Sequence, residues 1–169
     1  VSLYQQMQLI DNLNVGYEKS SRLIVKSLPS DTLYKQTHNS LFDAIKDLPG
    51  VEQVTASNTD LTDDMESNLQ FTWPNGEVLS GMQPTVATSY YPVETLGLTL
   101  LAGRDFSPQF SGDWYYRNEE QSRIVSVIVS RRMAELAGYQ DLDSVIGLTL
   151  IEPRRNMKAK VVGVIENVK

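Results

Sequence analysis

The sequence of 169 residues contains no cysteine and a single histidine, His38. The lack of cysteine excludes disulfide bonds, thiolate metal ligands and cysteine nucleophiles. One histidine has no second imidazole with which to build a metal cluster, so we expect a surface or packing role for it. The phosphate-binding string G-x-x-x-x-G-K-S/T and the nucleophile string G-x-S-x-G are also missing. These absences predict a protein that is not an enzyme and that has no cofactor.

Long hydrophobic runs are missing as well. No stretch approaches the roughly 20 apolar residues needed to cross a bilayer. The chain opens on Val1-Ser2-Leu3, without a start methionine or a signal sequence. We therefore expect it to be an excised piece of a longer protein.

Acidic side chains outnumber basic ones, 21 to 15, which gives a net charge of −6. A negative surface repels phosphate backbones, so the charge argues against nucleic acid as a partner. Four acidic residues lie close together, but they lack the alternating oxygen ligands and the turn glycine of a calcium loop. We expect a solvated acidic loop at these residues, Asp60, Asp63, Asp64 and Glu66.

The first third of the chain alternates between helical and extended patterns. Apolar side chains recur at helical spacing over residues 1–15. That helix either packs on its own domain or is the end of a longer helix. Residues 22–28 are typical of a strand, residues 31–47 of a helix that Pro49 ends, and residues 51–57 of a second strand. The last three segments predict a β-α-β unit with a parallel or near-parallel pair of strands.

The middle of the chain is rich in turn signals. Pro74-Asn75-Gly76, between residues 68–73 and 77–82, predicts a β-hairpin. Pro92 suits the first position of a helix. Residues 107–122 are polar and are expected to form a surface loop.

The last third of the chain is again predicted to contain both strands and a helix. A continuous apolar run predicts a strand over 124–129 that is covered on both faces. Ser130 is expected to cap a helix over 131–137, which Gly138 ends. Two further strands follow, over 148–151 and 159–165. The predicted fold class is α+β.

Two aromatic features are predicted at the surface, one beside the hairpin turn and one in the polar loop. Aromatic side chains are enriched at protein–protein contacts. They also anchor loops onto the domain that carries them. Partner contact and anchoring stay open as alternatives for the residues concerned, Trp73, Trp114, Tyr115 and Tyr116.

Several short strings recur in one order along the chain. They are Leu48-Pro49-Gly50-Val51, Leu101-Ala102-Gly103-Arg104-Asp105-Phe106, Val127-Ile128-Val129-Ser130, Leu136-Ala137-Gly138, Ile146-Gly147 and Val161-Val162-Gly163-Val164-Ile165. In order and spacing they resemble the periplasmic core domain of MacB-type, FtsX-like ABC transporter permeases. The resemblance covers nearly the whole chain, from about residue 10 onward.

The resemblance implies a fold and a location. The domain would lie in the periplasm, between the first and second membrane helices of an inner-membrane permease. Residues 1–20 would be the outward extension of the first membrane helix. A porter-like β-α-β core would comprise residues 21–57 and 123–169. Residues 58–122 would be a β-rich insert with a hairpin and a variable loop.

The resemblance also implies partners and a function. The partners would be a cytoplasmic ATPase subunit, a homologous permease domain as dimer partner, and a periplasmic adaptor or cargo. The function would be mechanotransmission, in which ATP hydrolysis inside the cell changes the conformation of the outer domains for export or release of a substrate. An extracytoplasmic ligand-sensing or solute-binding module is the alternative.

The residues shared with this family make sense as scaffold. Sharp turns or a close approach of two backbones would require Gly50, Gly103, Gly147 and Gly163. Arg104 is expected to hold a carboxylate or a carbonyl at a turn. Phe106 is expected to anchor that turn in the core.

Overall fold

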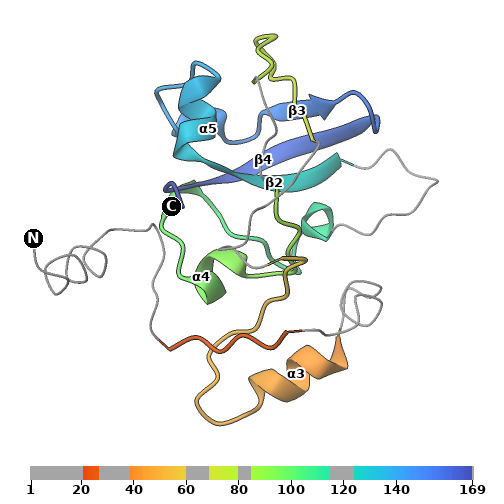
Figure 1. Ribbon diagram of the computed structural model, residues 1–169, viewed down its shortest axis with the longest axis vertical. Helices are drawn as coiled ribbons and strands as arrows, with labels where there is room; N and C mark the ends of the chain where they lie inside the picture. The colour runs from red at the N-terminus through yellow and green to blue at the C-terminus, as the bar shows by residue number, and fades with distance from the viewer. Residues whose placement is uncertain (1–20, 27–38, 60–68, 80–84, 115–123, 169) are drawn as a thin grey trace, which may run out of the picture.

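The computed structural model describes residues 21–26, 39–59, 69–79, 85–114 and 124–168 (Figure 1). Several predictions fall outside these ranges. They concern the helix over 1–15, His38, the acidic loop over 60–66, and Tyr115 and Tyr116.

A four-stranded mixed sheet organises the described part of the chain (Figure 1). Its strands are β1 (Leu100–Gly103), β2 (Ile124–Ser130), β3 (Thr149–Glu152) and β4 (Met157–Ile165). The long strand β4 lies at the centre, with β2 parallel to it along one edge. Antiparallel β3 and β1 share the other edge, β3 beside residues 157–160 and β1 beside residues 163–165. Together with the helices, this sheet places the protein in the α+β class.

The helices are short. They are α3 (Ser40–Lys46), α4 (Pro92–Leu96) and α5 (Arg131–Leu136), with two 3₁₀ turns, η1 (Ser111–Asp113) and η2 (Asp143–Val145). Pro92 occupies the start of α4, as predicted. The α5 helix also begins and ends as predicted, since the Ser130 side chain accepts from the backbone N–H of Met133 and Gly138 follows with φ +90°.

The predicted hairpin is found around Pro74-Asn75-Gly76. The backbone N–H of Gly76 donates to the carbonyl of Trp73, and that of Trp73 donates to the carbonyl of Glu77. Gly76 has φ +85°, a conformation that glycine adopts without steric cost. Thr72 exchanges two backbone hydrogen bonds with Ile151, at 2.8 and 3.0 Å. The hairpin therefore continues the sheet beyond β3.

One hydrophobic core lies between the sheet, α5 and the hairpin. Phe71, Trp73 and Leu79 come from the range predicted as an insert, and they pack with residues from the closing strands. The buried cluster comprises Phe71, Trp73, Leu79, Ala102, Val125, Val129, Ala134, Ala137, Val145, Leu150, Ala159, Val161 and Val164. Both sides of the predicted boundary at residue 122 thus contribute to the same core.

The β-α-β unit predicted over residues 22–57 is not present in the described part of this range. Residues 22–26 and 51–57 form no strand ladder with each other. The reason lies in the backbone hydrogen bonds of residues 56–58, which are made with residues 87–89 instead. Ser57 and Thr88 form an isolated antiparallel bridge there. The parallel pair of this fold is β2 with β4, in another part of the chain.

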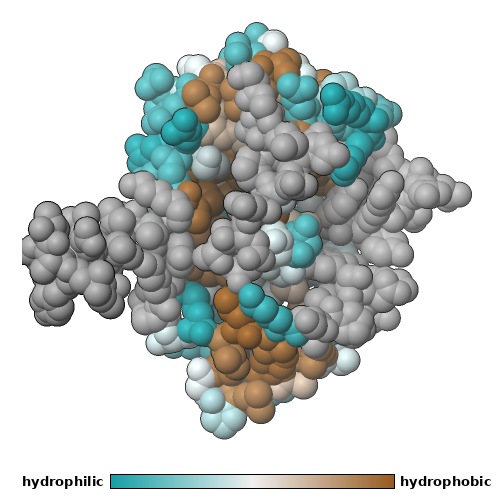
Figure 2. All heavy atoms as spheres, in the orientation of Figure 1, coloured by the Kyte–Doolittle hydropathy of each residue, from teal (hydrophilic) through white to brown (hydrophobic). Residues whose placement is uncertain are grey.

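The segment 22–26 keeps its apolar side chains at the surface. Leu23, Ile24 and Val25 are 90%, 64% and 60% exposed. Figure 2 shows apolar side chains on the end of the molecule where residues 21–26 and α3 lie. The described part of the predicted helix over 31–47 is α3, which buries none of its residues.

The strand β2 is less covered than its apolar run predicts. Val125 and Val129 are buried, whereas Ile124 is 53% exposed. The residues between them are half-buried. One face of β2 is therefore packed in the core and the other is only partly covered, which corrects the prediction of full cover on both faces.

Candidate functional site

The segment 95–99 joins the end of α4 to the start of β1. It begins in the last turn of α4, where Gly97 has φ +63° and donates to the carbonyl of Glu94. Leu98 donates to the carbonyl of Val93 at 2.9 Å. This pattern ends the helix and turns the chain towards β1.

The incoming part of the described chain binds this segment. The Nε atom of Arg22 donates to the backbone carbonyl of Thr95 at 2.7 Å, across 73 positions of sequence. The last four carbonyls of a helix have no partner within it, and that end of the helix carries partial negative charge. A guanidinium group bound there satisfies one carbonyl and complements the charge.

The outgoing part of the chain binds the same segment. The backbone N–H of Glu166 donates to the carbonyl of Thr99 at 2.9 Å. The Glu166 carboxylate forms an ion pair with Arg131 at 3.2 Å, and Asn167 Oδ1 accepts from the backbone N–H of Arg132 at 2.8 Å. These contacts fix the chain where it leaves β4.

Both ends of the described chain therefore contact one short segment. Thr95 and Thr99 are four residues apart, which spans about 14 Å even when fully extended. Arg22 binds one and Glu166 binds the other. In Figure 1 the segment 21–26 lies below α4 and the C-terminus lies above it, at the end of β4.

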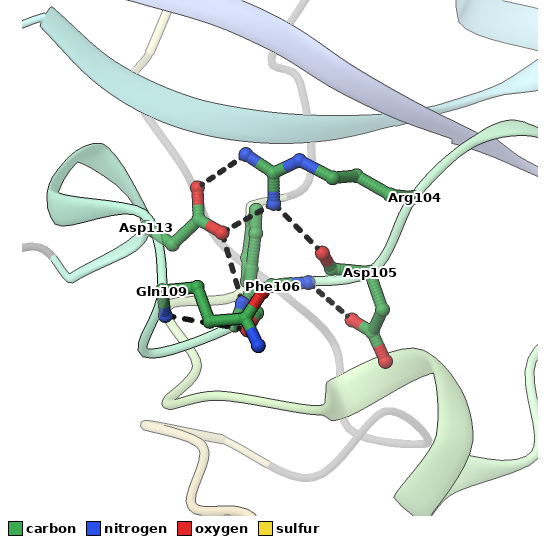
Figure 3. Close-up of polar contacts among 6 residues, drawn as sticks. Arg104, Asp105, Phe106, Gln109 and Asp113 are labelled. Atoms are coloured by element: carbon green, nitrogen blue, oxygen red, sulfur yellow. Dashed lines mark hydrogen bonds and ion pairs between the residues drawn. The ribbon is translucent and has the colours of Figure 1, made fainter.

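A second cluster surrounds Arg104, directly after β1 (Figure 3). The two terminal nitrogens of Arg104 bind the two carboxylate oxygens of Asp113, at 2.5 and 3.1 Å. Nη1 also donates to the carbonyl of Asp105, and the guanidinium carbon lies 3.5 Å from the centre of the Phe110 ring. Arg104 thus binds a carboxylate and a carbonyl, the two kinds of acceptor expected for it.

Asp113 was not identified from the sequence, because it lies in a range predicted to be a surface loop. The structure buries it in η1, with 4% of its surface exposed. Besides the two bonds from Arg104, its carboxylate accepts the backbone N–H of Ser107 at 2.9 Å. A buried carboxylate needs such partners, and all of them come from residues 104–107.

Asp105 ties this cluster to α4. One of its oxygens accepts the backbone N–H of Glu94 at 3.0 Å, and the other accepts that of Phe106 at 2.7 Å. Burial raises the pKa of Asp105 above its ordinary value, although the backbone hydrogen bonds act in the opposite direction. Phe106 is only half-buried and lies outside the core, which corrects its predicted anchoring role. The chain is held there by its backbone, since the Phe106 carbonyl accepts from Tyr91.

Both tryptophans predicted at the surface are buried. Trp73 is 1% exposed, and its ring lies 5.3 Å from that of Tyr139. Trp114 is 7% exposed, and its ring lies 5.3 Å from that of Tyr90. Burial raises the pKa of the Tyr90 phenol, with a further contribution from the charge of Asp113. These two tryptophans anchor their loops, which favours that alternative over partner contact.

The four glycines shared with the family divide into two kinds. Gly50 and Gly147 have φ values of +86° and +88° and open space around them, so they serve sharp turns. Gly103 and Gly163 are paired across β1 and β4, where a side chain on either would collide with backbone atoms. The second pair marks a close approach of two strands.

The chemistry available in the described ranges is limited. Nowhere among these residues do three or more histidine, cysteine, aspartate or glutamate side chains converge as a potential metal site. None of the described helices is long and apolar enough to span a membrane. The carboxylate groups of Asp113 and Asp105 both accept hydrogen bonds from within the domain. The cluster therefore stabilises a turn.

The chain matches no protein-family model, no curated protein and no solved structure.

Proposed function

We propose that this chain is the extracytoplasmic, periplasmic domain of an inner-membrane ABC transporter permease of the MacB-type, FtsX-like kind. In this role it is a body without catalytic activity that transmits movement. ATP hydrolysis by a cytoplasmic subunit would shift the membrane helices of the parent protein. The domain would convert that shift into a conformational change that exports or releases a substrate.

One observation carries the proposal: the incoming and outgoing parts of the chain bind the same five-residue segment, 95–99. A domain inserted between two consecutive membrane helices must receive and return the chain on one side. The contacts of Arg22 and Glu166 with one segment support such an insertion. They also fix both ends to the sheet, since Thr99 immediately precedes β1.

The core supports this function because it is stiff. The strand β4 pairs along both edges, and Leu150, Val161 and Val164 within the sheet are fully buried. A porter-like core would consist of β2, α5, β3 and β4, in which α5 and β3 connect the parallel pair. In the complete protein, the partners would be the ATPase subunit, a homologous permease domain and a periplasmic adaptor or cargo.

Cysteine labelling in cells tests the location. Because this chain has no cysteine, Gln140→Cys places one thiol in the domain, at an exposed position after α5, in a full-length parent protein whose other cysteines have been replaced. A membrane-impermeant maleimide should label it in intact cells whose outer membrane has been permeabilised. Ala137→Cys, at a position 1% exposed, is the matched control and should react only after unfolding. Labelling of Gln140→Cys only after lysis of the inner membrane would overturn the proposal.

Purification of the parent protein tests the coupling. Extracted in mild detergent, it should retain an ATPase subunit. Trapping that subunit with vanadate and ATP should change the maleimide reaction rate of a thiol in this domain. A parent protein without membrane spans and without an associated ATPase would favour a ligand-sensing or solute-binding module.

A further inference from the structure

Each end of the described chain forms a hydrogen bond with a terminal turn of a helix that lies elsewhere in the sequence. Arg22 donates to a carbonyl in the last turn of α4. Asn167 accepts from Arg132, the second residue of α5, across 35 positions of sequence. Helix termini leave backbone groups without a partner, so side chains that bind there stabilise the terminal turn. In this protein, two such contacts come from the incoming and outgoing segments.

The two contacts are joined through the segment 95–99. Glu166 donates to Thr99, and Asn167 is the next residue. The Glu166 carboxylate reaches Arg131, the first residue of α5. At its other end, α4 is bound to Asp105 through the backbone N–H of Glu94. A continuous set of contacts thus runs from both ends of the described chain, through α4, to the Arg104 cluster.

We propose that the contacts of Arg22 with Thr95, Glu166 with Thr99 and Asn167 with Arg132 form an end latch. Separation of the two ends breaks the latch, which loosens the last turn of α4 and the first turn of α5 and frees α4 to shift relative to the Arg104 cluster. Tension at the ends is thereby converted into a local change within the domain. The latch rests on the proposed function only for the source of that tension.

Amide hydrogen exchange on the 169-residue chain tests the coupling. Arg22→Ala should speed exchange at Thr95, Gly97 and Leu98 roughly three- to tenfold, as expected for loss of a cap. It should also speed exchange at Glu166, whose N–H binds Thr99. Asn167→Ala should act in the same way on Arg132. Acceleration confined to α4 in Arg22→Ala, or no acceleration, would overturn the latch.

Matched controls separate the latch from general effects of substitution. Arg154→Ala removes the same charge from an exposed position in the turn between β3 and β4. Gln140→Ala removes an exposed amide group. Both should leave exchange at Thr95, Glu166 and Arg132 unchanged.

A pulling experiment tests the mechanical part. Ser21→Cys and Val168→Cys provide attachment points for handles in a chain without native cysteine. An opening step should precede global unfolding, and it should occur at lower force in the Arg22→Ala, Asn167→Ala double variant. A single unfolding step, at the same force in parent and variant, would overturn the latch. Periplasmic labelling of the parent protein does not depend on this result.

Discussion

Gly103 and Gly163 face each other across β1 and β4, and neither position has room for a side chain. A Cβ on Gly103 would overlap the carbonyl oxygen of Val162, and one on Gly163 would lie 2.5 Å from the carbonyl oxygen of Arg104. Val162 and Arg104 are themselves joined by a backbone hydrogen bond of 2.9 Å. The two glycines therefore set the close approach that brings Arg104 to the edge of the sheet.

Gly163→Ala should destabilise the domain by about 1–3 kcal/mol, because the new methyl group meets backbone atoms that cannot move without disturbing the sheet. The free energy of unfolding in urea measures the effect. Gly112→Ala is the control, since its Cβ would meet the Ser126 hydroxyl at 3.2 Å, a side chain that can rotate away. Equal losses in the two variants would contradict the importance of the close approach.

The pair of Arg104 and Asp113 should also contribute to stability. Asp113→Asn keeps the shape of the side chain but removes the charge that accepts two bonds from Arg104. We expect a loss of about 1.5–3 kcal/mol in the free energy of unfolding, typical of hydrogen bonds to a charged group. Gln109→Ala, at an exposed position in the same loop, should change it by less than about 0.5 kcal/mol. An unchanged unfolding midpoint for Asp113→Asn would show that the pair is not stabilising.

The second half of the fold could be predicted because its signals are local. Ser130 accepts the backbone N–H three residues further along, Gly138 follows the end of the helix, and the apolar run before Ser130 predicts a strand. Each of these features depends on residues that are near in sequence. The predicted boundaries of α5, β3 and β4 therefore lie close to the observed ones.

The rest depends on contacts between distant residues. Ala56 and Ser89 exchange backbone and side-chain hydrogen bonds across 33 positions, and nothing in the pattern of residues 51–57 indicates that partner. Arg22 binds a backbone carbonyl, which every residue has, so its target Thr95 leaves no trace in the sequence. Asp113 is a carboxylate in a polar stretch, and only the fold shows that it is buried.

Trp73 should stabilise the domain by packing in its core. Trp73→Ala removes a core side chain that is 1% exposed and packs on Tyr139, so we expect a loss of about 3–5 kcal/mol. Trp73→Phe keeps an aromatic ring in that place and should recover a large part of the loss. Thermal unfolding compares the three chains. A Trp73→Ala variant with the stability of the parent would contradict the anchoring role of Trp73.

The raised pKa of Asp105 predicts how stability changes with pH. Because burial raises the pKa in the folded state, the folded chain holds this proton at pH values where the unfolded chain has lost it. The contribution of Asp105 to the free energy of unfolding is therefore fully present below the unfolded pKa of about 4. That contribution is lost as the pH rises through the higher pKa of the folded state. Urea unfolding between about pH 3 and 7 should show that decline in the parent and a flatter profile in Asp105→Asn. Glu135→Gln, on the exposed face of α5, is the control and should keep the pH profile of the parent. If the decline in stability persists in Asp105→Asn, another group causes it.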